Sequence, residues 1–156
     1  MTLGNRNCYS LQKLIRSKTL SRNLKCELYR SLIRPVVAYG SEAWCTTQSD
    51  EQRLLVFERR ILRSIFGGVN VSGNWRRRYN HELYQPYKEP GIVKFIKINR
   101  LRWLGHVQRM TEERLPLKLL NTNPDGNRRP ERPRARWKDA IESDLKVPSS
   151  FLFRVM

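Results

Sequence analysis

Two histidines are the residues whose types most readily suggest chemistry. His106 lies in the basic run RLRWLGHVQRM beside Gly105, which leaves room for a partner, so a phosphate or base contact competes with a structural hydrogen bond. His81 directly precedes Glu82 in YNHELY. Adjacent helical residues point about 100° apart, so these two cannot act as an acid–base pair. We therefore predict no catalytic site in this chain.

A carboxylate pattern near the C-terminus offers a second kind of chemistry. Asp125, preceded by proline, and the later Asp144 and Lys146 resemble the order of metal-binding residues in PD-(D/E)xK nucleases. That pattern places its second carboxylate on a strand, whereas the apolar residues around Asp144 recur with helical spacing. A metal-dependent nuclease thus remains an alternative, and our main expectation is that the chain has no metal site.

The charge of the chain indicates its class of partner. In 156 residues, 31 lysines and arginines oppose 14 acidic residues, giving a net charge of +17. Such an excess predicts a polyanion, with nucleic acid (RNA, RNA–DNA hybrid or DNA) ahead of a membrane, because no segment is long and apolar enough to span one. Three widely spaced cysteines indicate a reduced, intracellular protein, and we expect a nuclear location.

Helical periodicity dominates the elements that would position these residues. Residues 21–36 predict a helix capped by Ser21, with a kink at proline 35. Its expected buried stripe is Leu24, Leu28, Leu32 and Val36, broadened by Tyr29 and Ile33.

A second helix is predicted to start after a cap at Ser49 and to end at Gly67. Its expected buried stripe is Leu54, Phe57, Ile61 and Ile65, which leaves its arginines mostly on the outer face.

The later segments predict a short helix in a basic linker, a long helix over 91–110 and a short one over 115–121. After them we expect an Arg/Pro-rich loop and a last helix over 137–145. No strand-like alternation is evident, so we expect an all-α protein: an irregular helical bundle over 1–68, a linker over 69–91 and a second small helical lobe over 92–146. The tail 147–156 is unassigned.

Basic residues interleaved with aromatic rings are the expected nucleic-acid contacts, because guanidinium groups bind phosphates and rings stack on bases. The predicted contact residues are Arg59, Arg63, Arg76, Arg77, Arg78, His81, Arg100, Arg102, His106, Arg109, Arg128, Arg129, Arg132, Arg134 and Arg136.

Five blocks of sequence, taken in order, resemble a known family. They are LYRSLIRPVVAYGSEAW, LLVFERRILRSIFG, WRRRYNHELY, IKINRLRWLGHVQRM and RPRARWKDAIESDL. Together they are similar to the C-terminal part of reverse transcriptases encoded by non-LTR retrotransposons, over residues 4 to 145. Two positions depart from the family pattern. Glu131 stands where glycine is common in the family, and Gly68 stands where a proline often follows the Phe-Gly pair.

The resemblance implies that residues 11–66 correspond to the polymerase thumb, and that later blocks handle RNA and target DNA. The catalytic palm and its magnesium ions would belong upstream, so the chain itself is expected to bind without catalysis or cofactor. The upstream palm and fingers are a further expected partner. A nucleic-acid-binding accessory protein used by the host is the alternative reading.

Overall fold

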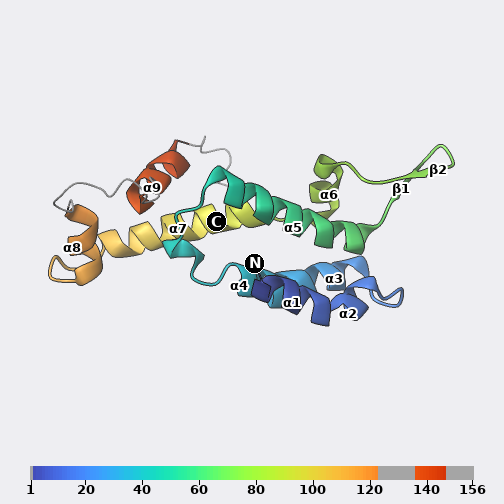
Figure 1. Ribbon diagram of the computed structural model, residues 1–156, viewed down its shortest axis with the longest axis horizontal. Helices are drawn as coiled ribbons and strands as arrows, with labels where there is room; N and C mark the ends of the chain where they lie inside the picture. Colours follow the sequence, from blue (N-terminus) through green and yellow to red (C-terminus); the bar gives the residue numbers. More distant parts are fainter. Residues whose placement is uncertain (1, 123–135, 147–156) are drawn as a thin grey trace. The chain divides into compact units, whose positions relative to one another are not determined.

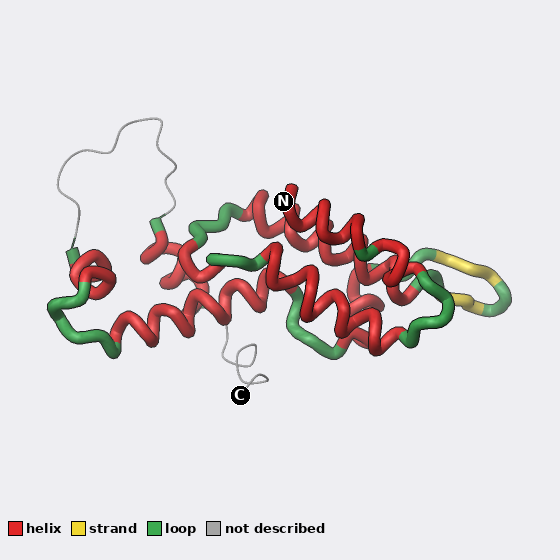
Figure 2. Tube along the Cα trace, turned by 90° about the horizontal axis from the view of Figure 1, so that it is seen from below, coloured by secondary structure: helices red, strands yellow, loops and turns green. Residues whose placement is uncertain are grey.

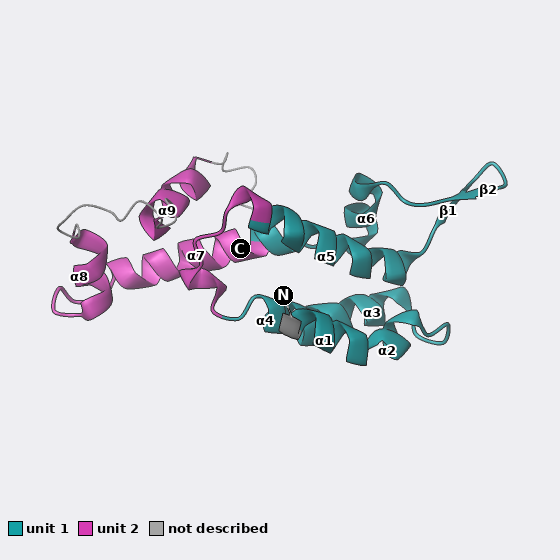
Figure 3. Cartoon of the chain, in the orientation of Figure 1, with its two compact units in different colours: residues 1–39, 50–94 teal, residues 40–49, 95–156 magenta. Residues whose placement is uncertain are grey.

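The computed structural model describes residues 2–122 and 136–146, and this part of the chain is helical except for one short hairpin (Figures 1 and 2). The predicted all-α class is therefore confirmed. Two compact units can be distinguished (Figure 3): unit 1 comprises residues 1–39 and 50–94, and unit 2 comprises residues 40–49 and 95–156. The units interleave along the chain, whereas the segments expected above are continuous, and those segment boundaries stay a prediction.

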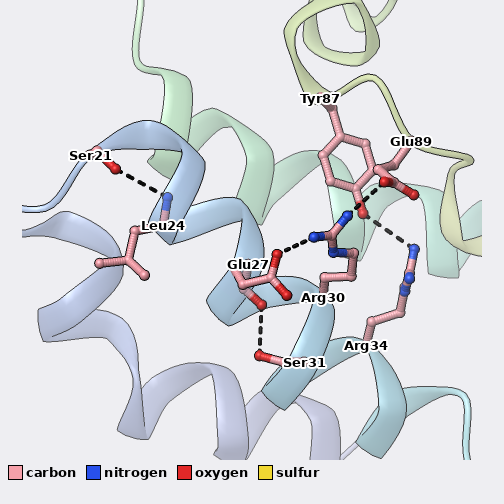
Figure 4. Close-up of polar contacts among 8 residues, drawn as sticks. All are labelled: Ser21, Leu24, Glu27, Arg30, Ser31, Arg34, Tyr87 and Glu89. Carbon is pink, nitrogen blue, oxygen red and sulfur yellow. Dashed lines mark hydrogen bonds and ion pairs between the residues drawn. The ribbon is translucent and has the colours of Figure 1, made fainter.

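Unit 1 begins with short helices: α1 (Thr2–Ser10), α2 (Gln12–Arg16), α3 (Arg22–Leu28), the π-helical turn η1 (Tyr29–Ile33) and α4 (Arg34–Val37). Ser21 caps α3 as predicted, since its Oγ accepts from the Leu24 N–H at 3.2 Å (Figure 4). The π-helical bonding ends just before proline 35, which has no N–H to continue an α-helical ladder.

The buried face of this helical run is only part of the predicted stripe. Leu24, Leu32 and Val36 are 45%, 44% and 42% exposed, while Tyr29 and Ile33 are fully buried. Tyr29 and Ile33 lie one residue, or about 100°, from Leu28 and Leu32 on the helix, at one side of the predicted stripe. That side is the buried one because the Tyr29 hydroxyl donates to the buried Glu58 at 2.9 Å.

Helix α5 (Gln48–Phe66) matches its predicted interior. Leu54, Phe57, Ile61 and Ile65 are all buried, and Gly67 ends the helix in the left-handed conformation with φ of 68°. The predicted cap at Ser49 is wrong, because the helix already begins at Gln48.

A β-hairpin, which the sequence analysis did not predict, follows α5. Strands β1 (Val69–Val71) and β2 (Asn74–Arg76) pair antiparallel, with Asn70 opposite Trp75. Ser72 and Gly73 both have positive φ, as a tight two-residue hairpin turn requires. Three-residue strands are too short to show the alternation by which strands are recognised in a sequence. Helix α6 (Asn80–Tyr87) comes next.

Polar contacts attach the chain around the end of α6 to the first helices of unit 1 (Figure 4). Arg30 pairs with Glu27 and, at 2.6 Å, with Glu89, while Arg34 Nη1 donates to the Tyr87 hydroxyl at 3.4 Å. These contacts fix α6 beside η1 and α4.

Unit 2 contains the 3-10 turn η2 (Ser41–Ala43), most of α7 (Ile92–Gln108), α8 (Leu115–Asn121) and α9 (Trp137–Leu145). Helices α8 and α9 occupy their predicted residues, and α7 is two residues shorter than predicted at its end. The Trp137 indole donates to the Glu42 carbonyl at 2.7 Å, which joins α9 to η2. Over 2–122 and 136–146, none of the helices has both the length and the apolarity needed to cross a membrane.

Candidate nucleic-acid interface

A basic hollow of about 610 Å³ lies in unit 1 where α5 ends and the hairpin begins. Its lining includes Arg60, Arg63, Arg76, Arg77 and Trp75, and none of the described residues that line it is acidic. A hollow walled by guanidinium groups and an indole favours an anion with a planar group, which describes a nucleotide. We call this hollow the hairpin hollow.

Arg63 is the most crowded cation of the hairpin hollow. Its Nη2 donates to Asn80 Oδ1 at 2.6 Å, while its Nε makes no hydrogen bond within the described residues. The pKa of its guanidinium lies below the ordinary value, first because of burial and then because of the positive charges of Arg77 and Arg59. A bound phosphate would relieve this repulsion. Arg59 is half-buried next to it, so both predicted α5 residues belong to this cluster.

Arg76, by contrast, is already neutralised. Its two terminal nitrogens donate to Glu82 at 2.9 and 2.6 Å, and its guanidinium lies 4.5 Å from the Tyr79 ring centre. Glu82 also accepts from the Tyr79 N–H at 2.7 Å at the start of α6. The hydrogen bond from Arg76, with that backbone bond, lowers the pKa of Glu82 to about 2. Arg76 therefore orders the N-terminus of α6.

The neighbours of Arg76 are more accessible. Arg77 is exposed, lines the hairpin hollow and makes no salt bridge within the described residues, and Arg78 is half-buried. Trp75 is 75% exposed on the hairpin. His81 is exposed, and its ring stacks on Tyr79 with centroids 5.9 Å apart and planes 15° apart. Exposed rings beside free guanidinium groups are suited to unpaired bases and phosphates.

Arg100 was predicted to contact nucleic acid at the surface, and this prediction is wrong. Arg100 is 1% exposed, its Nε lies 2.9 Å from Asp144 Oδ2, and its Nη1 donates to the Trp44 carbonyl at 3.0 Å. A buried charge requires such pairing, so Arg100 holds unit 2 together instead of facing a ligand. The sequence contains a signal for this, because Arg100 follows the buried Ile92 and Ile96 at four-residue intervals.

The other predicted residues of unit 2 lie at the surface. Arg102, His106 and Arg109 are exposed on or just after α7, and the His106 ring is 5.2 Å from that of Trp103. Arg136 is exposed immediately before α9 and lines a separate hollow of about 380 Å³ within unit 2. The Arg/Pro-rich loop with Arg128, Arg129, Arg132 and Arg134, and the tail 147–156, lie outside the described residues.

The nuclease alternative finds no support from Asp144. This carboxylate is 4% exposed and pairs with Arg100, and Lys97 Nζ approaches its other oxygen to 3.6 Å. A cation site would first have to break these pairs. Asp144 also lies on helix α9 and not on a strand, while Asp125 is outside the described residues. Within 2–122 and 136–146, no cluster of three or more His, Cys, Asp or Glu side chains could hold a metal ion.

Glu58 is a buried polar centre that our sequence analysis missed. Its carboxylate is fully buried and accepts from the Tyr29 and Tyr84 hydroxyls at 2.9 Å each and from the Ile92 N–H at 3.0 Å. Burial raises its pKa, and these donors oppose that shift. The available signal was its position on the apolar stripe of α5, between Leu54 and Ile61.

Gly91 explains how the start of α7 approaches this centre so closely. A Cβ at Gly91 would lie 3.0 Å from Glu58 Oε2 and 3.2 Å from the Tyr84 ring. The Glu58 carboxylate thus satisfies one of the unpaired N–H groups at the positive end of α7. Its role is to join α5, η1, α6 and the start of α7 within unit 1.

Comparison with known proteins gives one informative match. No family model matches the chain, and no solved structure matches it. An uncharacterised transposon-derived protein of Caenorhabditis elegans is 22% identical over 125 residues, which cover 80% of this chain and 45% of that protein. The chain therefore spans less than half the length of this curated relative. The likeness supports a transposon origin for the chain.

Proposed function

We propose that this chain is a nucleic-acid-binding, C-terminal part of a non-LTR retrotransposon reverse transcriptase, acting inside the cell and in the nucleus. Its contribution is to hold template–primer, element RNA or target DNA, while the chemistry belongs to the palm of the same polymerase. The palm and fingers are the proposed protein partners. The resemblance of five ordered blocks supports the family, and the transposon-derived relative is consistent with it.

The observation that carries the binding function is the hairpin hollow of unit 1. Arg63 and Arg77 are close enough for each positive charge to disfavour the other, and neither has an acidic partner within the described residues. The repulsion within this cluster lowers the stability of the fold. A bound phosphate would offset the repulsion. Arg76 on the same hairpin is, by contrast, paired with Glu82.

Fluorescence anisotropy with labelled RNA–DNA hybrid, single-stranded RNA and duplex DNA over a salt series tests this function. The logarithm of affinity should fall linearly with that of salt, with a slope of about −0.9 per phosphate contact on duplex DNA and about −0.7 on single strands. The double variant Arg63→Gln/Arg77→Gln should weaken binding to every probe and make the slope shallower by roughly one contact per arginine.

The matched control is Arg22→Gln/Arg53→Gln, which also removes two positive charges, from exposed positions of α3 and α5 that do not line the hairpin hollow. It should retain the affinity of the wild type at moderate salt. Equal losses in the control and the double variant would show that net charge alone produces binding, and the hairpin hollow would lose its assigned role.

A further inference from the structure

A second basic hollow, of about 700 Å³, lies beside the hairpin hollow in unit 1. It is lined by Arg6 and Tyr9 of α1, Arg16 of α2, and Arg60 and Ser64 of α5. As in the hairpin hollow, none of the described lining residues is acidic. We call it the α1 hollow.

The two hollows meet on one face of α5. Arg60 and Ser64 line both of them and lie one helical turn apart, a rise of about 6 Å along the axis. Arg60 is exposed, and its Nη2 donates to Asn5 Oδ1 at 3.3 Å, so its guanidinium is directed across the junction toward α1. The hollows therefore form one continuous basic surface with Arg60 near its middle.

Each hollow has a highly exposed aromatic ring in its lining. Tyr9 is 79% exposed in the α1 hollow, and Trp75 is 75% exposed in the hairpin hollow. Rings left in water bring no stability to the fold, whereas base–aromatic stacking contributes about 1 to 3 kcal/mol per base. Stacking needs the flat face of a base, which is covered by neighbouring bases in a duplex and accessible in a single strand.

We infer that these two hollows form a path for single-stranded nucleic acid, with unpaired bases stacking on Tyr9 and Trp75 and phosphates between them bound by Arg60. This inference rests on the proposed function and narrows its substrate class on unit 1. The thumb resemblance alone implies contact with a duplex, so the path is a separate property of this surface.

Alanine variants of the two rings test the path. Tyr9→Ala and Trp75→Ala are compared with Tyr39→Ala, a control whose ring is 86% exposed but lines neither hollow. The probes are a 16-nucleotide thymidine single strand, the same strand with abasic sites, and a 16-base-pair duplex. Each path variant should lose about fivefold or more in affinity for the single strand and nothing for the duplex, and the control should lose neither.

The abasic strand separates stacking from charge. The wild type should bind it more weakly than the intact strand, and the ring variants should bind it as the wild type does. Tyr9→Phe and Trp75→Phe should retain single-strand binding, because a phenyl ring also stacks on a base. Unchanged duplex affinity in the alanine variants excludes a fold defect as the cause.

Two results would overturn the path: unchanged single-strand affinity in both alanine variants, or equal losses on strand and duplex. The proposed function would stand in either case if Arg63→Gln/Arg77→Gln still weakens binding. The proposed function itself would be wrong if the Arg63→Gln/Arg77→Gln variant bound every probe as tightly as the wild type does.

Discussion

The hairpin of unit 1 and helix α7 of unit 2 use arginine in opposite ways. Around the hairpin hollow, Arg63 and Arg77 repel one another at a solvent-accessible surface. On α7, Arg100 is fully buried and pairs with Asp144. The two stretches, WRRRYNHELY and NRLRWLGHVQR, are similarly basic in sequence. Burial and the nearest carboxylate, not the density of arginines, therefore decide which of these residues is available to a ligand.

The largest expected effect comes from removing the buried arginine of unit 2. Arg100→Ala leaves Asp144 buried without its main partner, so the free energy of unfolding should fall by about 3 to 5 kcal/mol in chemical denaturation. Replacing both partners by leucine should recover most of the loss. Arg102→Ala, at an exposed position two residues later, should change stability by less than about 0.5 kcal/mol. If Arg100→Ala is instead as stable as the wild type and binds nucleic acid more weakly, Arg100 is a ligand contact and not a structural residue.

A smaller effect on stability is expected from Glu58, the buried carboxyl group of unit 1. Its hydrogen-bond donors are neutral groups, whereas Arg100 pairs with the carboxylate of Asp144. Because burial raises the pKa of Glu58, the folded state favours its protonated form. Its contribution to stability is then complete below the ordinary glutamate pKa and is lost as pH rises through the raised folded value.

Glu58→Gln should remove this pH dependence and lower stability by about 1 to 3 kcal/mol, because the amide cannot reproduce all of the acceptor contacts. Thermal unfolding of both proteins across pH 4 to 9 measures the difference. Parallel stability curves for wild type and variant would show that Glu58 does not titrate in this range.

The smallest effects are expected from replacing Arg76 or Arg77, and these two neighbours should differ in which property changes. Arg77→Gln should not lower thermal stability, because it removes the repulsion with Arg63, and it should make the salt dependence of binding shallower by roughly one contact. Arg76→Gln should instead release Glu82, whose pKa then rises toward its ordinary value.

Because the pKa of Glu82 is depressed to about 2 in the fold, its contribution is present above the ordinary glutamate pKa and is lost as pH falls toward 2. The small destabilisation by Arg76→Gln should accordingly disappear in strong acid, as measured by thermal unfolding at pH 6 and pH 2. If the variant loses affinity as strongly as Arg77→Gln, Arg76 is a ligand contact despite its salt bridge.

Long periodic segments made much of this fold predictable. The interior of α5 and the positions of α8 and α9 follow from apolar spacing alone. The first helical run was harder, because the predicted stripe was too broad and a tertiary contact, Tyr29 with Glu58, selects which side of it is buried. The hairpin was missed because each of its strands has three residues.

The sequence predicted a basic surface, but not which residues form it; its role as a nucleic-acid site stays a prediction. Charge and aromatic content indicated a polyanion surface, and the hairpin hollow contains three of the predicted arginines, Arg63, Arg76 and Arg77. Which arginines are neutralised depends on partners far along the chain, such as Asp144 for Arg100. Arg6, Tyr9 and Arg16 join the surface only because α1 and α2 fold against α5.

The Glu58 centre also has a consequence for how the chain folds during synthesis. Its hydrogen-bond donors come from residues 29, 84 and 92, so they emerge from a ribosome at widely separated times. A nascent chain that has exposed only α1 to α5 would have to bury the carboxylate with a single donor or keep it in water. Unit 1 should therefore remain open until residue 92 has emerged, and then close in one step.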